Sequence, residues 1–343
     1  MTQTGVARVA VVGVGSIGEV HLLSLLETPG CEVAAICDCN EERLEDIQRR
    51  YAIAHAYTHS EEMYEAQQID GVVIATNDEQ HRGPTEVACA AGAHILLEKP
   101  IATVLDDARA IVRAVHEAKI AVVMGFTLRW MPHYVALQQR AASGEFGQLV
   151  NAFARRAFRK MEARRIGGRC NVNQYLASHD VDYLLWLFGT ELTSVYAVDG
   201  NMVLRDELGV SDYYYNLLTW QNGARAVVHS SWIEPDGYPN HLEMELILNG
   251  SEAGAHLLLG GQEMTVANDR TSEKPGISYP PAVTIAYPLE AQHFVEVIRG
   301  RATPRGTVDN GLDALVVLTA AEESILRGQP VSVDLESDEV VPG

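Results

Sequence analysis

A glycine cluster near the start of the chain has the spacing of a phosphate-binding turn. GVGSIG (Gly13 to Gly18) separates the apolar run ARVAVV from IGEVHLLSLLE, whose apolar residues recur at helical spacing. Between a strand and a helix, G-x-G-x-x-G permits a tight turn, a close approach of backbone to a pyrophosphate, and close helix packing. Unpaired N–H groups and the positive dipole end at the helix start favour phosphates. The expected cofactor-binding residues of this turn are Gly13, Gly15, Ser16, Ile17 and Gly18.

Asp38 ends the second apolar run, CEVAAICD, twenty positions after the glycines. A carboxylate at this point accepts hydrogen bonds from the adenosine ribose hydroxyls and repels a 2′-phosphate. We therefore expect NAD in preference to NADP. Arg43 lies within reach of the same loop, where it would soften this exclusion; the favoured interpretation is a solvated position on the following helix.

Lys99 stands at the end of a third apolar run, HILLEKPIAT. A lysine at the carboxyl end of a central strand of a nucleotide-binding sheet lies at the ligand crevice. Pro100 restricts Lys99 to extended or turn geometry and so directs its side chain. An ammonium group there can polarise a substrate oxygen, and desolvation would lower its pKa. Taken by itself, the same lysine fits an exposed loop better than a ligand-binding position.

The secondary-structure pattern that positions these residues differs between the first 124 residues and the rest of the chain. Up to residue 124 strands alternate with helices, which predicts a doubly wound parallel sheet with its ligand beyond the carboxyl ends of the strands. The expected strands are 8–12, 32–37, 71–75, 94–97 and 120–124, and the loops that follow them are expected to carry function.

Beyond residue 125 the pattern predicts an α+β domain with an open, mostly antiparallel sheet. YYYNLLTW, Asn222-Gly223 and ARAVVHSSW predict a hairpin with a type I′ turn. One face of the sheet must pack on helices, and a partner subunit is the usual cover of the other. The segment 268–281 is expected to form a surface loop. Helices are expected at 132–142, 174–188, 289–299 and 308–327, and further strands at 241–248, 253–259 and 262–266.

The composition of the chain argues against several classes of protein. The net charge of -20 argues against nucleic acid or an anionic membrane as partner. We expect no membrane span, because no uncharged apolar stretch reaches eighteen residues, and no secretory signal precedes the first strand. Five cysteines without a framework spacing fit reduced thiols in a cytoplasm, and no ligand set at metal-binding spacing is found.

The order of these motifs resembles one family. GVGSIG, Asp38, IATNDEQH, EKP and YLASHDVDYLLWLFG resemble the glucose–fructose oxidoreductase / inositol dehydrogenase / MocA family over nearly the whole chain. The resemblance implies a Rossmann NAD(P)-binding domain (1–124) and an α+β domain for substrate binding and oligomerisation (125–343). It also implies NAD(P)-dependent oxidation of a sugar or cyclitol hydroxyl, and a homodimer or homotetramer built on the C-terminal sheet.

Carried over by position, the resemblance assigns roles to individual residues. Lys99 corresponds to the lysine that hydrogen-bonds the reacting hydroxyl, His179 to the general acid/base, and Arg129 to a substrate-contacting arginine. A histidine that titrates near neutral pH suits the transfer of the hydroxyl proton. Tyr175 replaces the aspartate that the family commonly has four residues before the histidine, and Asp182 can take over the orienting role. Further cofactor contacts are expected from Thr76, Asn77, His81 and Glu98.

Residues 155–169 (RRAFRKMEARRIGGR) hold seven basic residues and one acid in this acidic chain. One interpretation is an anionic substrate (a uronic acid, a sugar phosphate or a nucleotide sugar) held by guanidinium groups, with Arg164 and Arg165 as candidates. The other, slightly favoured, is a salt-bridged contact between subunits. Two other functions stay open for the fold: glycoside cleavage with transient use of bound NAD, and non-catalytic sensing of a dinucleotide and a sugar.

Overall fold

The computed structural model describes residues 5–237, 242–259, 263–267, 272–273, 282–337 and 339–341. Contacts divide the chain into two units. The first is Met1–Trp130 with Val283–Leu312, and the second is Met131–Ala282 with Asp313–Gly343. The segment Val283–Leu312 thus belongs to the first unit, whereas the sequence-based division put everything after residue 124 into the second domain.

The first unit contains the predicted doubly wound sheet. Its six strands are parallel and lie in the order β3-β2-β1-β4-β5-β6. The strands read as short apolar runs because both faces of the sheet are covered. Their bounds are β1 (Ala7–Val12), β2 (Cys31–Cys37), β3 (Ala56–Tyr57), β4 (Gly71–Ile74), β5 (His94–Leu97) and β6 (Val122–Met124).

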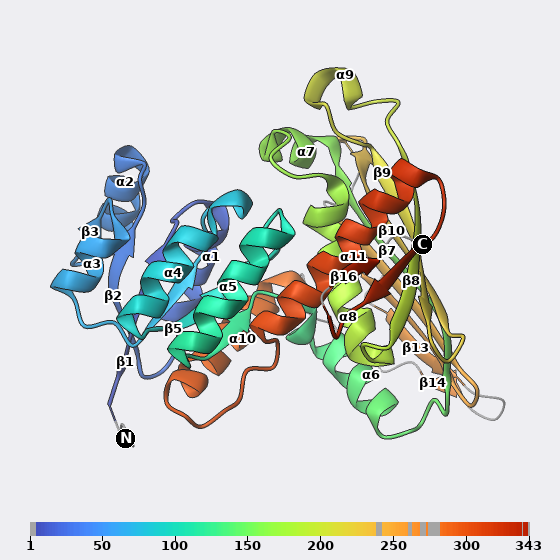
Figure 1. The fold of residues 1–343 in the computed structure, drawn as a ribbon. Coiled ribbons are helices and arrows are strands. Elements are labelled where there is room, and N and C mark those ends of the chain that lie inside the picture. Colours follow the sequence, from blue (N-terminus) through green and yellow to red (C-terminus); the bar gives the residue numbers. More distant parts are fainter. Residues whose placement is uncertain are drawn as a thin grey trace. The chain divides into compact units, whose positions relative to one another are not determined.

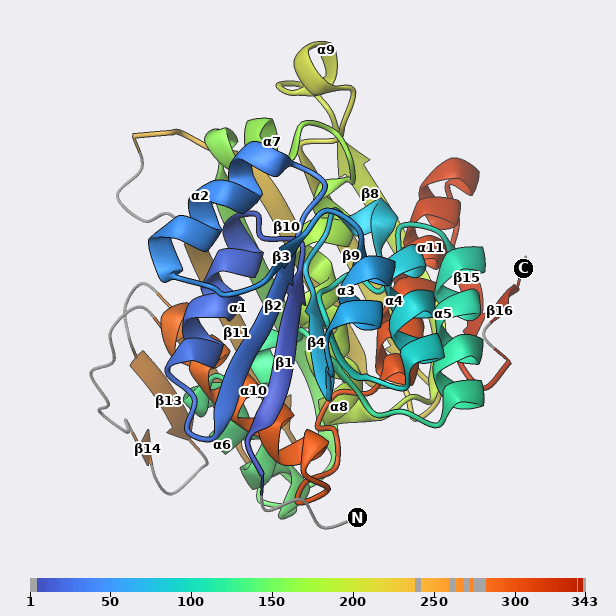
Figure 2. The same cartoon turned by 90° about the vertical axis from the view of Figure 1, so that its left-hand side faces the viewer.

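Two groups of helices flank this sheet. Helices α1 (Ser16–Leu26) and α2 (Glu41–Tyr51) lie on one face, and α3 (Ser60–Ala66), α4 (Arg82–Ala91) and α5 (Leu105–Ala118) lie on the other (Figure 2). Short 3-10 turns follow β4 and β6 at Asp78–Gln80 and Thr127–Arg129.

Helix α10 (Ala282–Ile298) completes the first unit from far along the chain. It packs on the face that carries α1, because Tyr287 meets the ring of His21 edge-on with centroids 5.1 Å apart. A Cβ on Gly71 of β4 would lie 2.5 Å from Cδ1 of Ile298 and 2.9 Å from Phe294, so a larger residue here would displace side chains of the helix that crosses the strand. The late helix therefore covers part of the sheet that α1 and α2 leave open.

The second unit is built on a ten-stranded sheet in the order β14-β13-β12-β11-β7-β10-β9-β8-β15-β16. Its pairs are antiparallel except β7 with β10, which confirms a mostly antiparallel sheet. The strands are β7 (Leu149–Arg159), β8 (Leu192–Gly200), β9 (Tyr213–Trp220), β10 (Arg225–Glu234), β11 (Leu242–Gly250), β12 (Gly254–Leu259), β13 (Glu263–Ala267), β14 (Ser272–Glu273), β15 (Val331–Asp334) and β16 (Glu339–Val341).

The predicted hairpin is present as β9 and β10, but its turn is not of type I′. Gly223 has a φ of +87°, whereas Asn222 is not among the residues with positive φ. The N–H of Gly223 bonds the carbonyl of Trp220, and Asn222 Oδ1 accepts the N–H of Ala224. A three-residue loop with glycine in the left-handed position joins the strands instead.

Helices cover one face of the second sheet. Figure 1 shows α6 (Pro132–Ala142), α8 (Ser178–Phe188) and α11 (Val308–Arg327) on the same side of the strands. Shorter helices are α7 (Lys160–Ile166), α9 (Arg205–Leu208) and a π-helical turn, Asn173–Ala177, directly before α8. The opposite face presents half-exposed apolar side chains, among them Tyr196, Val198 and Tyr215, and no helix from the described part of the second unit covers it.

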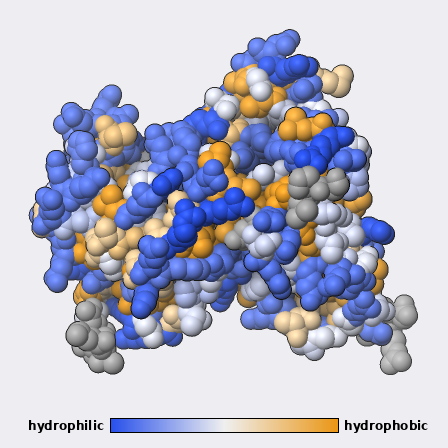
Figure 3. Space-filling model, in the orientation of Figure 1, coloured by the Kyte–Doolittle hydropathy of each residue, from blue (hydrophilic) through white to orange (hydrophobic). Residues whose placement is uncertain are grey.

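The described residues contain no helix long and apolar enough to cross a membrane. The surface over α2, α3 and α4 is mostly hydrophilic in Figure 3. The expected loop 268–281 lies outside the described residues, apart from Ser272–Glu273, which form β14, and the expected strands at 241–248 and 262–266 each begin on a residue outside them.

Candidate functional site

The glycine turn has the geometry that its sequence predicts. Gly13 has a φ of +84°, and a Cβ on Gly18 would lie 1.8 Å from the carbonyl oxygen of Gly13. A Cβ on Gly15 would meet no described atom within 4 Å. Gly13 and Gly18 are thus required by the chain itself, whereas the space at Gly15 is open to a ligand.

The start of α1 supplies anion-binding groups at this open space. Gly15 is the N-cap of the helix, and no side chain of the described residues caps it, so the first-turn N–H groups, including those of Ser16 and Ile17, point outward. Asp38 is held beside the turn, because its Oδ2 accepts the N–H of Val14 at 2.8 Å and its Oδ1 that of Asn40 at 2.9 Å. Uncapped N–H groups and a fixed carboxylate fit the pyrophosphate and the adenosine ribose of NAD.

The loop after β4 carries three more of the predicted cofactor residues. Thr76 is half-buried and Asn77 is exposed at the start of the 3-10 turn. His81 is buried, and its Nδ1 lies 2.8 Å from the carbonyl oxygen of Pro100. His81 therefore holds the loop that carries Lys99, a supporting role that the sequence did not indicate.

Lys99 is anchored at the end of β5 by its neighbour Glu98. One carboxylate oxygen of Glu98 lies 2.8 Å from Nε2 of the fully buried His21, and the other accepts the N–H of Lys99 at 3.0 Å. Burial would raise the pKa of Glu98, but the bond to His21 and the charge of Lys99 hold this pKa below its usual value. Glu98 is thus a buried anion that joins α1 to the Lys99 loop.

A second buried carboxyl group, that of Glu290 on α10, lies close enough to Glu98 to feel its charge. Its side chain is 0% exposed, and neither oxygen has a hydrogen bond of good geometry among the described residues. Burial raises the pKa of Glu290 well above its usual value, and the charge of Glu98 adds to this shift, while the indole of Trp130 opposes it. Burial thus favours the protonated form of Glu290 over the carboxylate.

Arg129 is buried, and its guanidinium is engaged within the first unit. Its Nη1 donates to the carbonyl of Arg305 at 2.6 Å, while Nη1 of Arg305 donates to the carbonyl of Arg129 at 2.8 Å. The guanidinium of Arg305 also lies over the ring of Trp130, 4.4 Å from its centroid. These contacts fix the loop after β6, and substrate contact by Arg129 stays a prediction.

In the second unit His179 lies in the first turn of α8 and is 9% exposed. Its neighbour Asp180 makes a buried bidentate ion pair with Arg156 of β7, with N···O distances of 2.8 and 3.0 Å. Asp182 is 1% exposed on the same helix. The helix that carries His179 is thus tied to the sheet by a charge pair at its start. A π-helical turn precedes it, a feature frequent at functional sites.

Tyr175 lies in this π-helical turn and bonds to the basic segment. Its hydroxyl group donates to Oε1 of Glu162 at 3.0 Å and accepts from Nη2 of Arg165 at 2.7 Å. Arg164 bonds Glu207 at 2.6 Å and Asp236 at 3.0 Å. Both candidate anion-binding arginines thus have acidic partners in their own chain, as does Arg155, which pairs with Glu234 and Glu243. The described partners of Arg155, Arg164 and Arg165 thus include carboxylates of the same chain.

Lys99 and Arg129 belong to the first unit, whereas Tyr175, His179, Asp182, Arg164 and Arg165 belong to the second. Sequence reasoning missed His21 and Glu290, and it placed Arg156 in the basic segment without its partner Asp180. Among the described residues, no group of three or more His, Cys, Asp or Glu side chains is arranged to hold a metal ion.

Two family models match the chain. Residues 7–126 match the NAD-binding Rossmann fold of an oxidoreductase family, and residues 167–333 match the C-terminal alpha/beta domain of the same family.

Curated relatives and solved structures match this chain over nearly its whole length. The scyllo-inositol 2-dehydrogenase (NAD(+)) of Bacillus subtilis is 28% identical, over 96% of this chain and 97% of the relative. The D-apiose dehydrogenase of Paraburkholderia graminis is 26% identical, over 97% of this chain and 92% of the relative. The crystal structure of scyllo-inositol dehydrogenase from Lactobacillus casei, with bound NAD(H) and scyllo-inositol, superposes with a TM-score of 0.82 at 19% identity, covering 95% of this chain and 98% of that one.

Proposed function

Because the chain belongs to the Gfo/Idh/MocA oxidoreductase family and carries its NAD-binding Rossmann domain, we propose that it oxidises a secondary hydroxyl of a cyclitol or sugar with NAD, or catalyses the reverse reduction. The relatives named above act on inositol or apiose, which supports a polyhydroxylated, uncharged substrate. The observation that carries the proposal is the placement of Lys99. It stands at the carboxyl end of β5, in the same unit as the glycine turn, and Glu98 fixes its backbone.

The proposed chemistry gives each side chain one task. The glycine turn and Asp38 would hold NAD, which would supply the acceptor for the hydride of the carbinol carbon. The ammonium group of Lys99 donates a hydrogen bond to the reacting oxygen and so stabilises the negative charge that develops on it. The imidazole of His179 takes the hydroxyl proton, and it returns this proton when the reaction runs in reverse.

The test is NADH absorbance with a panel of inositols, neutral sugars and sugar acids. We expect turnover of at least one neutral polyol, and a loss of kcat of about a hundredfold or more in Lys99→Met and in His179→Gln, each with NAD binding retained. Lys119→Met and His116→Gln are matched controls, since both side chains are exposed and distant in sequence from the motifs.

Three outcomes would contradict the proposal. Full activity in either variant refutes its assigned role. Release of an aglycone from a chromogenic glycoside without net NADH would move the enzyme to glycoside cleavage. Tight NAD binding without turnover of any substrate would favour a sensor.

An anionic substrate is the less favoured alternative. The carboxylates of Glu207 and Asp236 already pair with Arg164, and Glu162 with Arg165. An incoming anion would have to displace these partners. Arg164→Ala and Arg165→Ala are therefore expected to leave the turnover of both neutral and acidic sugars unchanged. A selective loss of activity on acidic sugars would reverse this conclusion.

We further propose that the chain forms a homo-oligomer through the open face of the second sheet. Val198 of β8 is 44% exposed, and its cross-strand partner Tyr215 is 42% exposed. An apolar sheet face of this kind is usually covered by another subunit. Val198→Asp should shift the sedimentation coefficient toward a smaller species, and an unchanged coefficient would place the interface elsewhere.

A further inference from the structure

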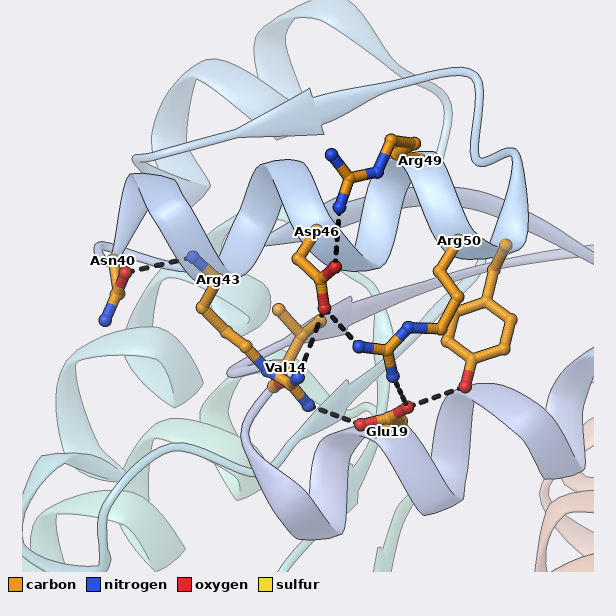
Figure 4. Close-up of polar contacts among 8 residues, drawn as sticks. Val14, Glu19, Asn40, Arg43, Asp46, Arg49 and Arg50 are labelled. Atoms are coloured by element: carbon orange, nitrogen blue, oxygen red, sulfur yellow. Dashed lines mark hydrogen bonds and ion pairs between the residues drawn. The ribbon is translucent and has the colours of Figure 1, made fainter.

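The guanidinium of Arg43, on α2, is locked onto the glycine turn. Its Nε donates to the carbonyl oxygen of Val14 at 2.8 Å, and its Nη2 pairs with the carboxylate of Glu19 on α1 (Figure 4). The sequence-based interpretation of Arg43 as a solvated helix position is wrong, since the side chain spans from α2 to the turn and is partly buried, at 28% exposure.

Glu19 is itself held in place from the other side. Its Oε1 accepts from Nη1 of Arg50 and from the hydroxyl of Tyr51, each at 2.6 Å. The bond from Tyr51 lowers the pKa of Glu19, and Arg43 and Arg50 lower it further against the effect of burial. Glu19 is therefore ionised throughout the neutral range.

Arg43 and Asp38 hold the same residue of the turn. Asp38 accepts the N–H of Val14, while Arg43 donates to the carbonyl of Val14. A ribose bound by Asp38 would therefore lie close to Arg43. In dinucleotide-binding folds a nearby arginine is the group that accommodates the 2′-phosphate of NADP. Here such an arginine is present, but its Nε bonds the carbonyl of Val14 and its Nη2 is paired with Glu19.

We propose that Glu19 is a second determinant of coenzyme choice. Asp38 repels a 2′-phosphate directly, and Glu19 withholds the guanidinium of Arg43 that would otherwise bind one. Selection of NAD over NADP thus rests on two carboxylates with different tasks. This inference rests on dinucleotide binding at the glycine turn and is independent of the substrate and of the catalytic roles proposed above.

The test measures binding without turnover, by calorimetric titration of the full chain with adenosine 2′,5′-bisphosphate and with 5′-AMP. The probes differ only in the 2′-phosphate. Asp38→Ser should bind the bisphosphate better than the parent chain, because the repulsion is gone. Adding Glu19→Gln should improve bisphosphate affinity by a further tenfold or so, with little change for 5′-AMP, since a freed guanidinium makes a charge-assisted bond to phosphate.

Two controls identify Arg43 as the source of the gain. Adding Arg43→Ala to the double variant should abolish the extra tenfold. Asp46→Asn in place of Glu19→Gln should give no gain, because Asp46 pairs chiefly with Arg49 and Arg50 and lies 3.8 Å from Arg43. The proposal is overturned if Glu19→Gln brings no gain, or if the gain survives the loss of Arg43.

A milder variant keeps the proposal testable if the double variant does not fold. In the Asp38→Ser background, Arg43→Gln should leave bisphosphate affinity within twofold, because Val14 and Glu19 hold the guanidinium at the turn. A marked loss of affinity would show that Arg43 is already available, which refutes the lock. Failure of the parent chain to oxidise polyols would not affect any of these binding results.

Discussion

The buried ion pair between Arg156 and Asp180 gives the sharpest stability prediction. The side chains are 4% and 5% exposed, and two N–H···O bonds join them between β7 and the first turn of α8. Burial alone would lower the pKa of Arg156, but the charge and hydrogen bonds of Asp180 raise it, so the arginine stays charged. Removing the carboxylate would leave that charge buried and uncompensated.

Asp180→Asn should therefore cost about 3–5 kcal/mol in the free energy of unfolding. At roughly 2–4 °C per kcal/mol for a unit of this size, the melting temperature should fall by about 6–20 °C. Replacing both partners, as in Arg156→Met with Asp180→Leu, removes the unpaired charge and should restore most of the loss. Urea unfolding and calorimetry of the full chain measure both quantities.

The exposed pair of Arg164 with Glu207 is the matched control, since its side chains are 44% and 45% exposed. Glu207→Gln should leave the melting temperature unchanged within error, because solvent screens such pairs. The reasoning is refuted if Asp180→Asn costs less than about 1 kcal/mol, or if the double variant is less stable than the single one.

Two further predictions follow from the first unit. The pKa of Glu290 is raised well above the usual 4.5, so the free energy of unfolding should decline as pH rises from that value toward the raised pKa. Glu290→Gln should flatten this decline and stabilise the chain at neutral pH. Urea unfolding at about pH 5 and about pH 8 measures the difference. A parallel decline in the variant would show that Glu290 is not the group responsible. Gly18→Ala should lower both the melting temperature and the affinity for NAD, because the new Cβ would lie 1.8 Å from the carbonyl oxygen of Gly13. Gly15→Ala should weaken NAD binding alone, because a Cβ there meets no described atom within 4 Å. Equal melting temperatures for the two variants would contradict this distinction.

The sequence predicted correctly those structural features that are set by residues close together in the chain. The glycine turn and Asp38 form one strand–turn–helix unit and its flank, so spacing alone placed them. The β9–β10 hairpin was also predicted, but the turn type was wrong because Asn222 keeps a negative φ and Gly223 alone takes the left-handed conformation. The presence of a turn is set by composition, whereas its backbone geometry is set by how the two strands pair.

Pairings between distant residues were not predictable. Nothing local marks His21 as the partner of Glu98, 77 positions away, or Arg156 as the partner of Asp180 rather than of a substrate. The same holds for Arg43, whose lock depends on α1 and α2 lying side by side. A basic segment looks the same in sequence whether its charges meet a ligand or, as with Arg164, carboxylates of the same chain.

The late position of α10 has a consequence for synthesis on the ribosome. The 152 residues from Met131 to Ala282 separate the two segments of the first unit. At about 5–20 residues per second, the nascent sheet waits roughly 8–30 s for the helix that crosses β4 at Gly71. During that interval the apolar surface meant for Phe294 and Ile298 faces solvent or a chaperone. The first unit, although its translation begins first, is therefore complete only after most of the second unit has been synthesised.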